Sequence, residues 1–289
     1  MAARRDRLAT LNDELRDSGA ASASAESPWL PLESNPEVFT SFAHRVGLPH
    51  AWRFCDVLSL DTELLGMVPR PVAAVILLFP CSEKIYAARR VEEDAVLAAA
   101  AQAPGGHHPP PARACFHIEQ VAAFGNACGT IAAVHALTNV GALAAGGAVA
   151  TFRKQNLART PTERGQALLT TEALKAESDG AAEHDAAQTM CPDRDGPDLD
   201  HHYCTFVPMT ANGAAGAGGA GGAGGAGGET YVVELDGTKV APIVHGPVVG
   251  GDFLEAVAAA VRAKFMAVEP DSIEFSLMAL CRSSSCGDG

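Results

Sequence analysis

The 289-residue sequence lacks a long hydrophobic segment, although 47% of its residues are apolar. Its most apolar run, residues 72–79 (VAAVILLF), is far shorter than the about 20 residues that a membrane-spanning helix needs. The first 27 residues mix Arg, Asp, Ala and Ser and contain no apolar stretch of signal-peptide length. We therefore expect neither a membrane segment nor a secretory leader, and we expect residues 72–79 to form a buried strand.

Basic residues are also scarce, with 21 Lys and Arg against 34 Asp and Glu, which gives a formal net charge of −13. This balance argues against a nucleic-acid-binding protein, because no basic face would offset phosphate repulsion. It favours a basic partner, or serves solubility alone. Without an export signal, the eight cysteines are expected to be free thiols rather than disulfides. We therefore expect a cytoplasmic or nuclear protein.

Helical and strand patterns alternate along the chain from about residue 28 onward. Apolar spacing, capping residues and flanking Gly or Pro predict helices at residues 36–47, 60–65, 84–102, 126–138, 152–157, 160–175 and 252–267. Alternating or continuous apolar runs predict strands at residues 52–58, 72–79, 201–209, 230–235 and 273–280. The pattern indicates one α/β or α+β domain over residues 28–289, preceded by a disordered or loosely helical extension over residues 1–27.

Three segments are expected to be loops. Residues 104–111 (PGGHHPPP) contain too many prolines for regular structure. Residues 178–199 are rich in acids and poor in large apolar side chains, so we expect a flexible loop. Residues 213–228 contain only Gly and Ala, which cannot bury a core. This last segment is predicted to be a disordered insertion that joins two hairpin strands.

The stretch AAFGNACGT, residues 122–130, places Cys128 where a polar turn becomes an apolar helix. We expect Asn126 to cap this helix, which puts Cys128 in its first turn. There, unpaired backbone N–H groups and the positive end of the helix dipole favour a thiolate. A buried, unreactive thiol remains an equal alternative at this point, because cysteine is among the most buried residue types.

A nucleophilic cysteine needs a base, and the base needs an orienting acceptor. His202 opens the predicted strand at 201–209, and Asp236 follows the predicted strand at 230–235. If these strands pair antiparallel, the carboxylate can fix the imidazole tautomer while the other ring nitrogen faces the sulfur. A surface histidine and a turn-forming Asp-Gly pair remain the alternative interpretation.

Several blocks resemble those of the short, L-type ubiquitin carboxyl-terminal hydrolases, which are papain-like cysteine peptidases. The blocks are residues 29–36 (WLPLESNP), 54–80 (FCDVLSLDTELLGMVPRPVAAVILLFP), 125–135 (GNACGTIAAVH), 234–237 (ELDG) and 243–246 (IVHG), in the order of that family. The resemblance implies an α+β, papain-like fold with a central, mostly antiparallel sheet flanked by helices, and a knotted backbone. It also implies that Cys128 is the nucleophile, His202 the general base and Asp236 its orienting residue.

The family's oxyanion-hole glutamine corresponds to Gln120, at the end of the CFHIEQ block. Its side-chain amide would join the Cys128 backbone N–H in stabilising the tetrahedral intermediate. The linker from this glutamine to the Gly-Asn pair is two residues longer than in the family, and strict counting back from Cys128 reaches Ala122, which has no donor. We expect the extra residues to bulge out so that Gln120 reaches the site. The alternative is an impaired oxyanion hole.

Other histidines compete for the role of base. Only His202 is followed directly by an aromatic residue, as in the family, and strand alternation turns His201 to the opposite side, where we expect it to be solvated. His135 lies on the helix of the cysteine itself and is expected to be a core or supporting residue. We expect no cofactor and no metal, because the spacing is irregular among Cys191, His201, His202 and Cys204.

The resemblance further implies a deubiquitinase that hydrolyses ester, thioester, amide or isopeptide bonds at the C-terminal glycine of ubiquitin. A crossover loop at about residues 178–199 would restrict the leaving group to small or unfolded ones. Ubiquitin is the expected partner of a monomer that binds neither nucleic acid nor membranes, and the acidic charge suits the basic face of ubiquitin. Two alternatives stay open: a catalytically impaired ubiquitin-binding protein, and a hydrolase of another ubiquitin-like modifier.

Overall fold

The computed structural model describes residues 29–103, 105–140, 147–189, 191, 199–210 and 229–282. The expected extension at residues 1–27 and the Gly/Ala insertion at residues 213–228 lie outside these ranges. Residues 190 and 192–198 of the expected crossover loop lie outside them as well.

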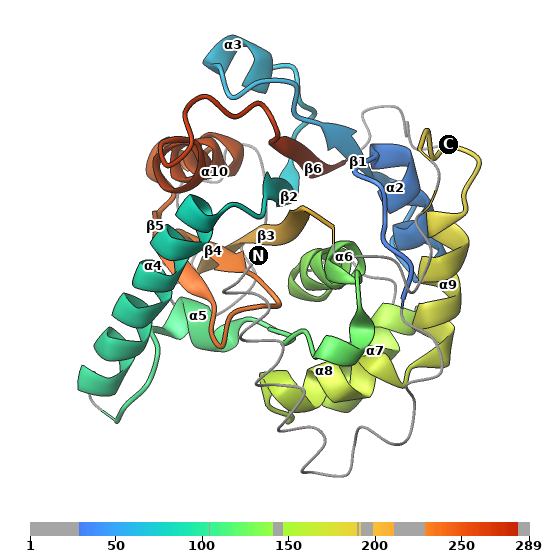
Figure 1. Cartoon of the computed structure of the whole chain (residues 1–289), viewed down its shortest axis with the longest axis horizontal. Helices are drawn as coiled ribbons and strands as arrows, with labels where there is room; N and C mark the ends of the chain where they lie inside the picture. Colours follow the sequence, from blue (N-terminus) through green and yellow to red (C-terminus); the bar gives the residue numbers. More distant parts are fainter. Residues whose placement is uncertain are drawn as a thin grey trace.

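A six-stranded antiparallel sheet forms the centre of the described structure (Figure 1). Its strands are β1 (Trp52–Asp56), β2 (Val72–Pro80), β3 (His201–Thr210), β4 (Thr230–Leu235), β5 (Ile243–Pro247) and β6 (Ser276–Arg282). They lie in the order β1-β6-β2-β3-β4-β5, and all neighbours are antiparallel. β2 lies between β6 and β3 and is buried along almost its whole length. Burial on both faces explains its continuous apolar run.

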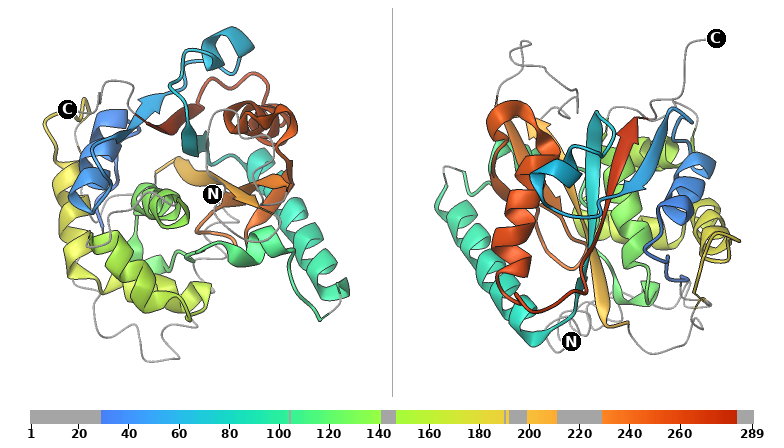
Figure 2. Two further views of the ribbon diagram at one scale, coloured as in Figure 1. Left: turned by 180° about the vertical axis from the view of Figure 1, so that it is seen from behind. Right: turned by 90° about the horizontal axis from the view of Figure 1, so that it is seen from above.

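Helices cover both faces of this sheet (Figure 2). One face carries α6 (Cys128–Asn139), which is buried along its whole length, together with α2 (Pro36–Arg45), α7 (Ala148–Asn156), α8 (Pro161–Leu169) and α9 (Glu172–Ala182). The other face carries α3 (Thr62–Leu65), α10 (Phe253–Val261) and its π-helical continuation η4 (Arg262–Met266). From Ala74 onward, consecutive residues of β2 enter different cores, because side chains of a strand alternate between its faces.

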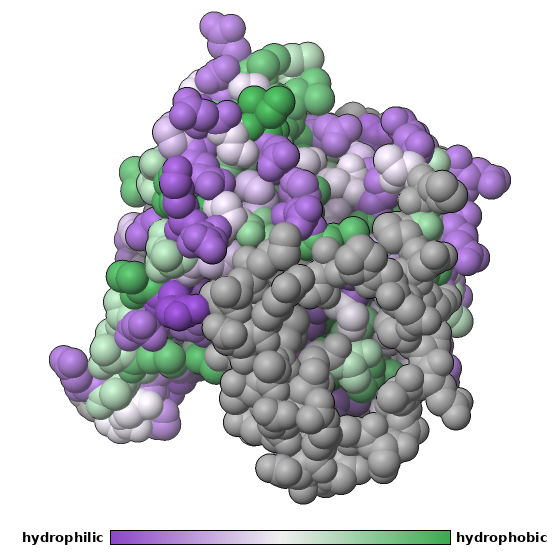
Figure 3. All heavy atoms as spheres, viewed as in Figure 1, coloured by the Kyte–Doolittle hydropathy of each residue, from purple (hydrophilic) through white to green (hydrophobic). Residues whose placement is uncertain are grey.

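The long helix α4 (Glu83–Gln102) follows β2 directly and extends away from the sheet at the lower left of Figure 1. Only its first half and its last turn contribute buried side chains, which are Ile85, Tyr86, Arg89 and Ala100. Apolar groups therefore reach the surface near α4 and near α3 (Figure 3). Among them, Val91 of α4 is 69% exposed.

The fold class predicted from the sequence is confirmed: the molecule is α+β, with an antiparallel sheet flanked by helices. All five predicted strands have counterparts, and β5 was missed, since its sequence IVHGP lacks a clear strand pattern. The knotted course of the backbone stays a prediction. Among helices of the described ranges, none combines the length and apolarity that a bilayer crossing requires.

The expected loop at residues 104–111 is partly wrong, because Pro110 and Pro111 begin helix α5 (Pro110–Ala114). Proline is tolerated in the first turn of a helix, where its missing N–H would have had no intrahelical partner. The prolines therefore start a helix rather than exclude one.

The predicted helix at residues 160–175 is two helices, α8 and α9. They are separated by Thr170 and Thr171, whose hydroxyls both donate to the carbonyl of Ala167. Such side-chain bonds to the preceding turn favour a helix end. Since α9 continues to Ala182, residues 178–182 of the expected crossover loop are helical.

Candidate active site

Cys128 is the first residue of α6, as the sequence predicted, but the cap of this helix differs from the expectation. The N-cap is Ala127, and no side chain caps the helix. Asn126 Oδ1 instead accepts a hydrogen bond from Leu199 N at 3.4 Å. Asn126 therefore ties the end of the crossover segment to the start of α6. The uncapped N–H groups of α6 leave the positive end of the helix dipole beside the sulfur.

The start of α6 is packed too closely for a larger residue at position 129. A Cβ atom on Gly129 would lie 3.2 Å from Leu32 Cβ and 3.2 Å from the Tyr203 ring. One residue further, Thr130 Oγ1 and Ser178 Oγ lie 2.5 Å apart. Cys128 itself is 5% exposed. The cysteine is thus held at the N-terminal end of a tightly packed, buried helix.

The strand pairing brings His202 and Asp236 together. β3 and β4 pair antiparallel with Thr205 opposite Leu235, so the start of β3 lies beside the residue that follows β4. His202 Nε2 donates to Asp236 Oδ1 at 2.7 Å, and both side chains are buried. The hairpin geometry expected from the sequence is therefore present.

The electrostatic environment of His202 favours its protonated form. Burial lowers the pKa of this histidine, but the carboxylate of Asp236 and the sulfur of Cys128 raise it, and the net result is a pKa above the usual 6.5. Nδ1, the ring nitrogen that does not face Asp236, is buried and makes no conventional hydrogen bond with described residues. The sulfur and the carboxylate thus both influence the charge of the imidazole.

Asp236 is held by donors on both of its carboxylate oxygens. Oδ1 accepts from Thr238 N at 2.9 Å and Thr238 Oγ1 at 2.7 Å, in addition to His202. Oδ2 accepts from Arg89 Nη2 at 2.6 Å. Burial alone would raise the pKa of Asp236, but His202 and Arg89 hold it well below its usual value. This carboxylate is therefore ionised although it is buried.

The sequence interpretation missed both Thr238 and Arg89. An aspartate followed two residues later by threonine is a recognisable turn signal, so Thr238 was within reach of sequence reasoning. Arg89 is 147 positions away from Asp236 on a different element, and nothing in the local sequence marks it as a partner of the site.

Gln120 lies next to the loop that leads into α6. Its side-chain Nε2 donates to the Gly125 carbonyl at 3.1 Å, and its backbone N donates to the Gly237 carbonyl at 2.6 Å. Its Oε1 is buried and has no hydrogen-bond partner among described residues. The residues between Gln120 and Gly125 include a short 3₁₀ turn, η2 (Ala122–Phe124). Because a 3₁₀ turn is more compact than an extended chain, the longer linker still leaves Gln120 close to the start of α6.

The other histidines of interest have different surroundings. His201 is half-buried at the start of β3. His135 is fully buried in α6, and its Nε2 accepts a hydrogen bond from Ile118 N at 2.9 Å. Burial and the neighbouring His117 place the pKa of His135 well below the usual value, so this ring is neutral. His135 is therefore a core residue, one of the two roles expected for it.

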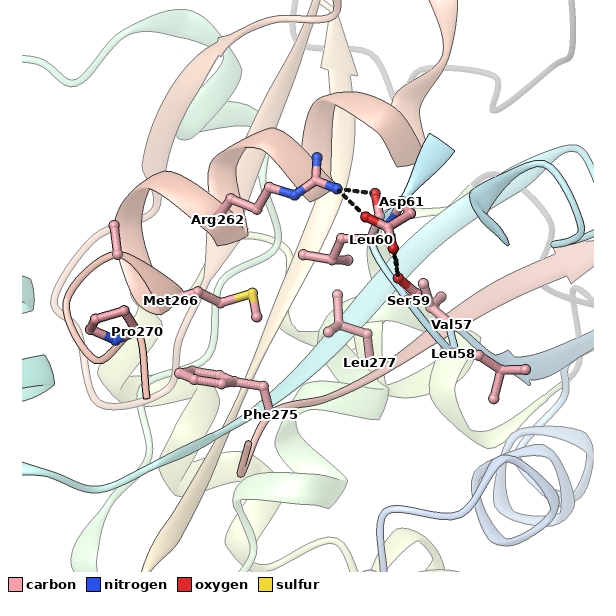
Figure 4. A pocket seen from close by; sticks show the side chains of 11 residues that line it. Val57, Leu58, Ser59, Leu60, Asp61, Arg262, Met266, Pro270, Phe275 and Leu277 are labelled. Atoms are coloured by element: carbon pink, nitrogen blue, oxygen red, sulfur yellow. Dashed lines mark hydrogen bonds and ion pairs between the residues drawn. The ribbon is translucent and has the colours of Figure 1, made fainter. Parts of the chain in front are cut away.

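The described residues contain no group of three His, Cys, Asp or Glu side chains that could hold a metal ion. A separate cavity of about 520 Å³ lies between the segment after β1 and the segment before β6 (Figure 4). Leu60, Met266 and Phe275 are among its lining residues, and Arg262 reaches across to Asp61 at 3.7 Å. None of the candidate site residues lines it.

A cysteine at the start of a buried helix, beside a buried His–Asp pair on an antiparallel sheet, defines the class of the cysteine peptidases. Comparison with known proteins identifies the family within that class. Residues 29–267 match the ubiquitin carboxyl-terminal hydrolase family 1. The chain belongs to this family of cysteine-type deubiquitinating enzymes, as its sequence resemblance predicted.

Individual relatives agree with this assignment. The chain is 33% identical over 253 residues to a ubiquitin carboxyl-terminal hydrolase of Drosophila melanogaster, covering 87% of this chain and 96% of the relative. It is 35% identical over 252 residues to one of Aplysia californica, covering 86% of this chain and 99% of the relative. The crystal structure of the Trichinella spiralis UCH37 catalytic domain bound to ubiquitin vinyl methyl ester has a similar fold. The TM-score is 0.64 at 22% identity, with 91% of this chain and 100% of that chain covered.

Proposed function

We propose that this protein is a thiol-dependent hydrolase of ester, thioester, amide or isopeptide bonds at the C-terminal glycine of ubiquitin, with Cys128, His202 and Asp236 as its catalytic triad. The observation that carries the proposal is the 2.7 Å hydrogen bond from His202 Nε2 to Asp236 Oδ1. It leaves Nδ1 for the sulfur, whose charge contributes to the raised pKa of the imidazole. The Trichinella relative supports ubiquitin as the substrate, because it binds a ubiquitin vinyl methyl ester.

The proposed reaction begins when His202 takes the proton of the Cys128 thiol. The thiolate attacks the carbonyl carbon of the terminal glycine, and the carbonyl oxygen becomes an oxyanion. The imidazolium then gives its proton to the leaving amine or alcohol, and a thioester remains on Cys128. His202 next takes a proton from water, whose oxygen attacks the thioester and expels the sulfur as a thiolate. The imidazolium returns its proton to that sulfur, and the released carboxylic acid of ubiquitin loses its own proton to solvent. Asp236 orients the imidazole throughout.

Gln120 is proposed to stabilise the oxyanion together with the backbone N–H of Cys128. One amide hydrogen of Gln120 is used by the Gly125 carbonyl, and a second amide hydrogen is available on the same nitrogen. Donors that are already positioned need no rearrangement as the charge develops.

The preference for small or unfolded leaving groups is proposed from the position of the crossover segment. Glu33 Oε2 accepts from Gln188 N at 2.8 Å and Thr189 N at 3.1 Å. At the other end of the segment, Asn126 binds Leu199 and Cys81 N donates to the Asp200 carbonyl at 2.7 Å. Both ends are thus tied to the body of the enzyme, and one of them is tied two residues before Cys128.

The proposal is tested with a ubiquitin that carries a C-terminal electrophile and with a fluorogenic ubiquitin amide. We expect the electrophile to label the wild type and not Cys128→Ala. We expect His202→Ala to lose hydrolysis, while the matched variant His201→Ala keeps it. Full hydrolysis by His202→Ala would overturn the choice of base. An unlabelled wild type would refute the proposed activity.

One alternative is a ubiquitin-binding protein with an impaired oxyanion hole, in which Gln120 stays bound to the Gly125 carbonyl and does not contact the oxyanion. If Gln120 acts in catalysis, Gln120→Ala should lower kcat about 100- to 1,000-fold, because one oxyanion donor is lost. Unchanged turnover would show that the assignment of Gln120 is wrong. A wild type that binds ubiquitin without turnover would select the alternative. The other alternative is that the substrate is a different ubiquitin-like modifier. Parallel assays with a fluorogenic amide of such a modifier test it.

A further inference from the structure

Arg89 is a buried cation that contacts two carboxylates of the same strand end. The residue is 3% exposed. Its Nη2 donates to Asp236 Oδ2 at 2.6 Å and to Glu234 Oε1 at 2.5 Å. A single guanidinium nitrogen therefore joins the aspartate of the proposed triad to a second buried acid.

Aromatic rings hold the guanidinium in place. Its central carbon lies 4.9 Å from the centroid of the Phe79 ring and 4.6 Å from that of Phe265. Such cation–π contacts are strongest where water is excluded. The Phe79 ring also meets the His202 ring edge-on, with centroids 5.5 Å apart. Arg89 and His202 thus share one packing partner.

The two oxygens of Asp236 face different partners, which fixes the orientation of the carboxylate. Oδ1 faces His202 and Thr238, and Oδ2 faces Arg89. Without the guanidinium, Oδ2 would lose its charged donor, and two buried carboxylates would lie near each other with less compensating charge. Under those conditions a buried acid takes up a proton, or its side chain turns away.

Other charged groups surround this cluster on several elements. Glu234 Oε2 accepts from His245 Nε2 at 2.8 Å. Lys239 Nζ donates to the backbone carbonyl of Arg89 at 3.0 Å and lies 3.8 Å from Glu93. The remaining titratable groups that act on Asp236, Arg89 or their partners are Glu92, His117, Cys128, His135 and Cys204. Among the cations, only Arg89 contacts both Glu234 and Asp236 within the described structure.

We propose that Arg89 is a positioning residue of the hydrolase, which keeps Asp236 ionised and turned so that its Oδ1 orients His202. The inference rests on the proposed catalytic role of Cys128, His202 and Asp236. It adds α4 to the elements that build the site, and it gives the second buried acid, Glu234, a function as the other anchor of the guanidinium.

The test compares kcat, KM and the pH profile of fluorogenic ubiquitin amide hydrolysis in variants of the full chain. For Arg89→Met we expect kcat to fall about 10- to 100-fold, less than the about 10⁴-fold that follows a changed orienting carboxylate itself. We expect KM to stay near the wild-type value and the acidic limb of the profile to move to higher pH. Arg89→Lys keeps the charge and should restore part of the kcat that Arg89→Met loses.

Two further variants distinguish a positioning role of Arg89 from a general effect on protein stability. Arg89→Met combined with Glu234→Gln should recover part of kcat, because one of the two uncompensated acids is gone. Arg70→Met is the matched control, since Arg70 also binds an aspartate, Asp252 at 2.9 Å, and backbone carbonyls outside the site. It should keep the wild-type pH profile.

The inference is overturned if Arg89→Met keeps the wild-type kcat and pH profile. If the Met variant does not fold, Arg89→Gln, which also removes the charge, takes its place under the same criterion. It is also overturned if lost activity tracks the unfolded fraction alone, with an unshifted profile in the folded protein and no recovery in the double variant. A wild type without hydrolysis would refute the proposed function instead, and this result is obtained before any Arg89 variant is made.

Discussion

Asp236 is the residue on which most of the site converges. Its side chain binds His202 of β3, Arg89 of α4 and the nearby Thr238, and its backbone carbonyl accepts from His117 Nε2 at 3.0 Å. A neutral His117 that donates from Nε2 has no hydrogen on Nδ1, so the ring position is set by this carbonyl. A single aspartate thus connects four segments of the chain.

The pKa values of this residue and of His202 predict the pH range of activity. Because the pKa of His202 is raised, its charge and the associated stabilisation persist below pH 6.5 and are lost only as pH rises through the higher folded-state value. Asp236, with a lowered pKa, contributes above its ordinary value of 3.8 and loses its contribution as pH falls further. The imidazolium protonates the leaving group, so activity falls when His202 loses its proton. We therefore expect the basic limb of kcat/KM to lie above pH 6.5, the ordinary value for histidine.

The measurement is the pH profile of ubiquitin amide hydrolysis by the wild type and by Asp236→Asn. The variant removes the carboxylate that raises the pKa of His202, while burial remains, so the basic limb should move to lower pH and kcat should fall about 10²- to 10⁴-fold. A basic limb that does not move in this variant would contradict the coupling of the two residues.

At the scale of elements, α4 links the proposed positioning residue to the sheet. Ser82 is the N-cap of this helix, and its Oγ accepts from Ile85 N at 3.2 Å. Its first two turns pack Ile85, Tyr86 and Arg89 against the body, while most of the rest is exposed. The start of α4 is therefore the part that holds Arg89 in place.

Loss of the Ser82 cap should destabilise the first turns of α4, which hold Arg89. For Ser82→Ala we expect the free energy of unfolding to drop by about 1 kcal/mol, since a helix N–H loses its acceptor. Ser82→Asp supplies another acceptor and should keep wild-type stability. Denaturant unfolding of both variants gives the comparison, and equal destabilisation by Ala and Asp would show that capping is not the cause.

At the scale of the whole molecule, the sheet joins segments that are far apart in the sequence. β1 pairs with β6, the last strand of the described residues, and β2 pairs with both β6 and β3. The start of β3 and the end of β4 build the His–Asp pair, whereas the opposite ends of these strands pair through Thr210 and Thr230. In the sequence the Gly/Ala insertion falls between Thr210 and Thr230, and these two residues lie at the strand ends opposite to His202.

This arrangement predicts that the insertion is dispensable. Deleting residues 213–228 should leave kcat and KM nearly unchanged, because the remaining residues still link the paired ends of β3 and β4. Ubiquitin amide hydrolysis and thermal unfolding of the shortened protein check this. A large loss of activity would mean that the repeat has a structural role.

Several features could be predicted because the forces that set them act locally. The apolar run of β2, the Asn35-Pro36 start of α2 and the Gly47 end after it are all visible in the sequence, and the structure contains them. The Cys128 helix and the His202–Asp236 hairpin were also within reach, since residue order along paired strands decides which side chains meet. The prediction that Asn126 caps α6 was wrong, because its side-chain oxygen instead accepts from Leu199 N, which is distant in the sequence.

Residue patterns along the chain were therefore enough to predict the α+β class, the family and the three residues of the proposed triad. Two other features follow from the packing of distant elements: Arg89 joins Glu234 to Asp236, and Gln120 contacts the loop before α6 despite its longer linker. The difference lies in the distance along the chain over which each interaction acts. Helix caps and strand periodicity act between residues a few positions apart, whereas a buried ion pair depends on how distant elements pack and leaves no periodic trace in the chain.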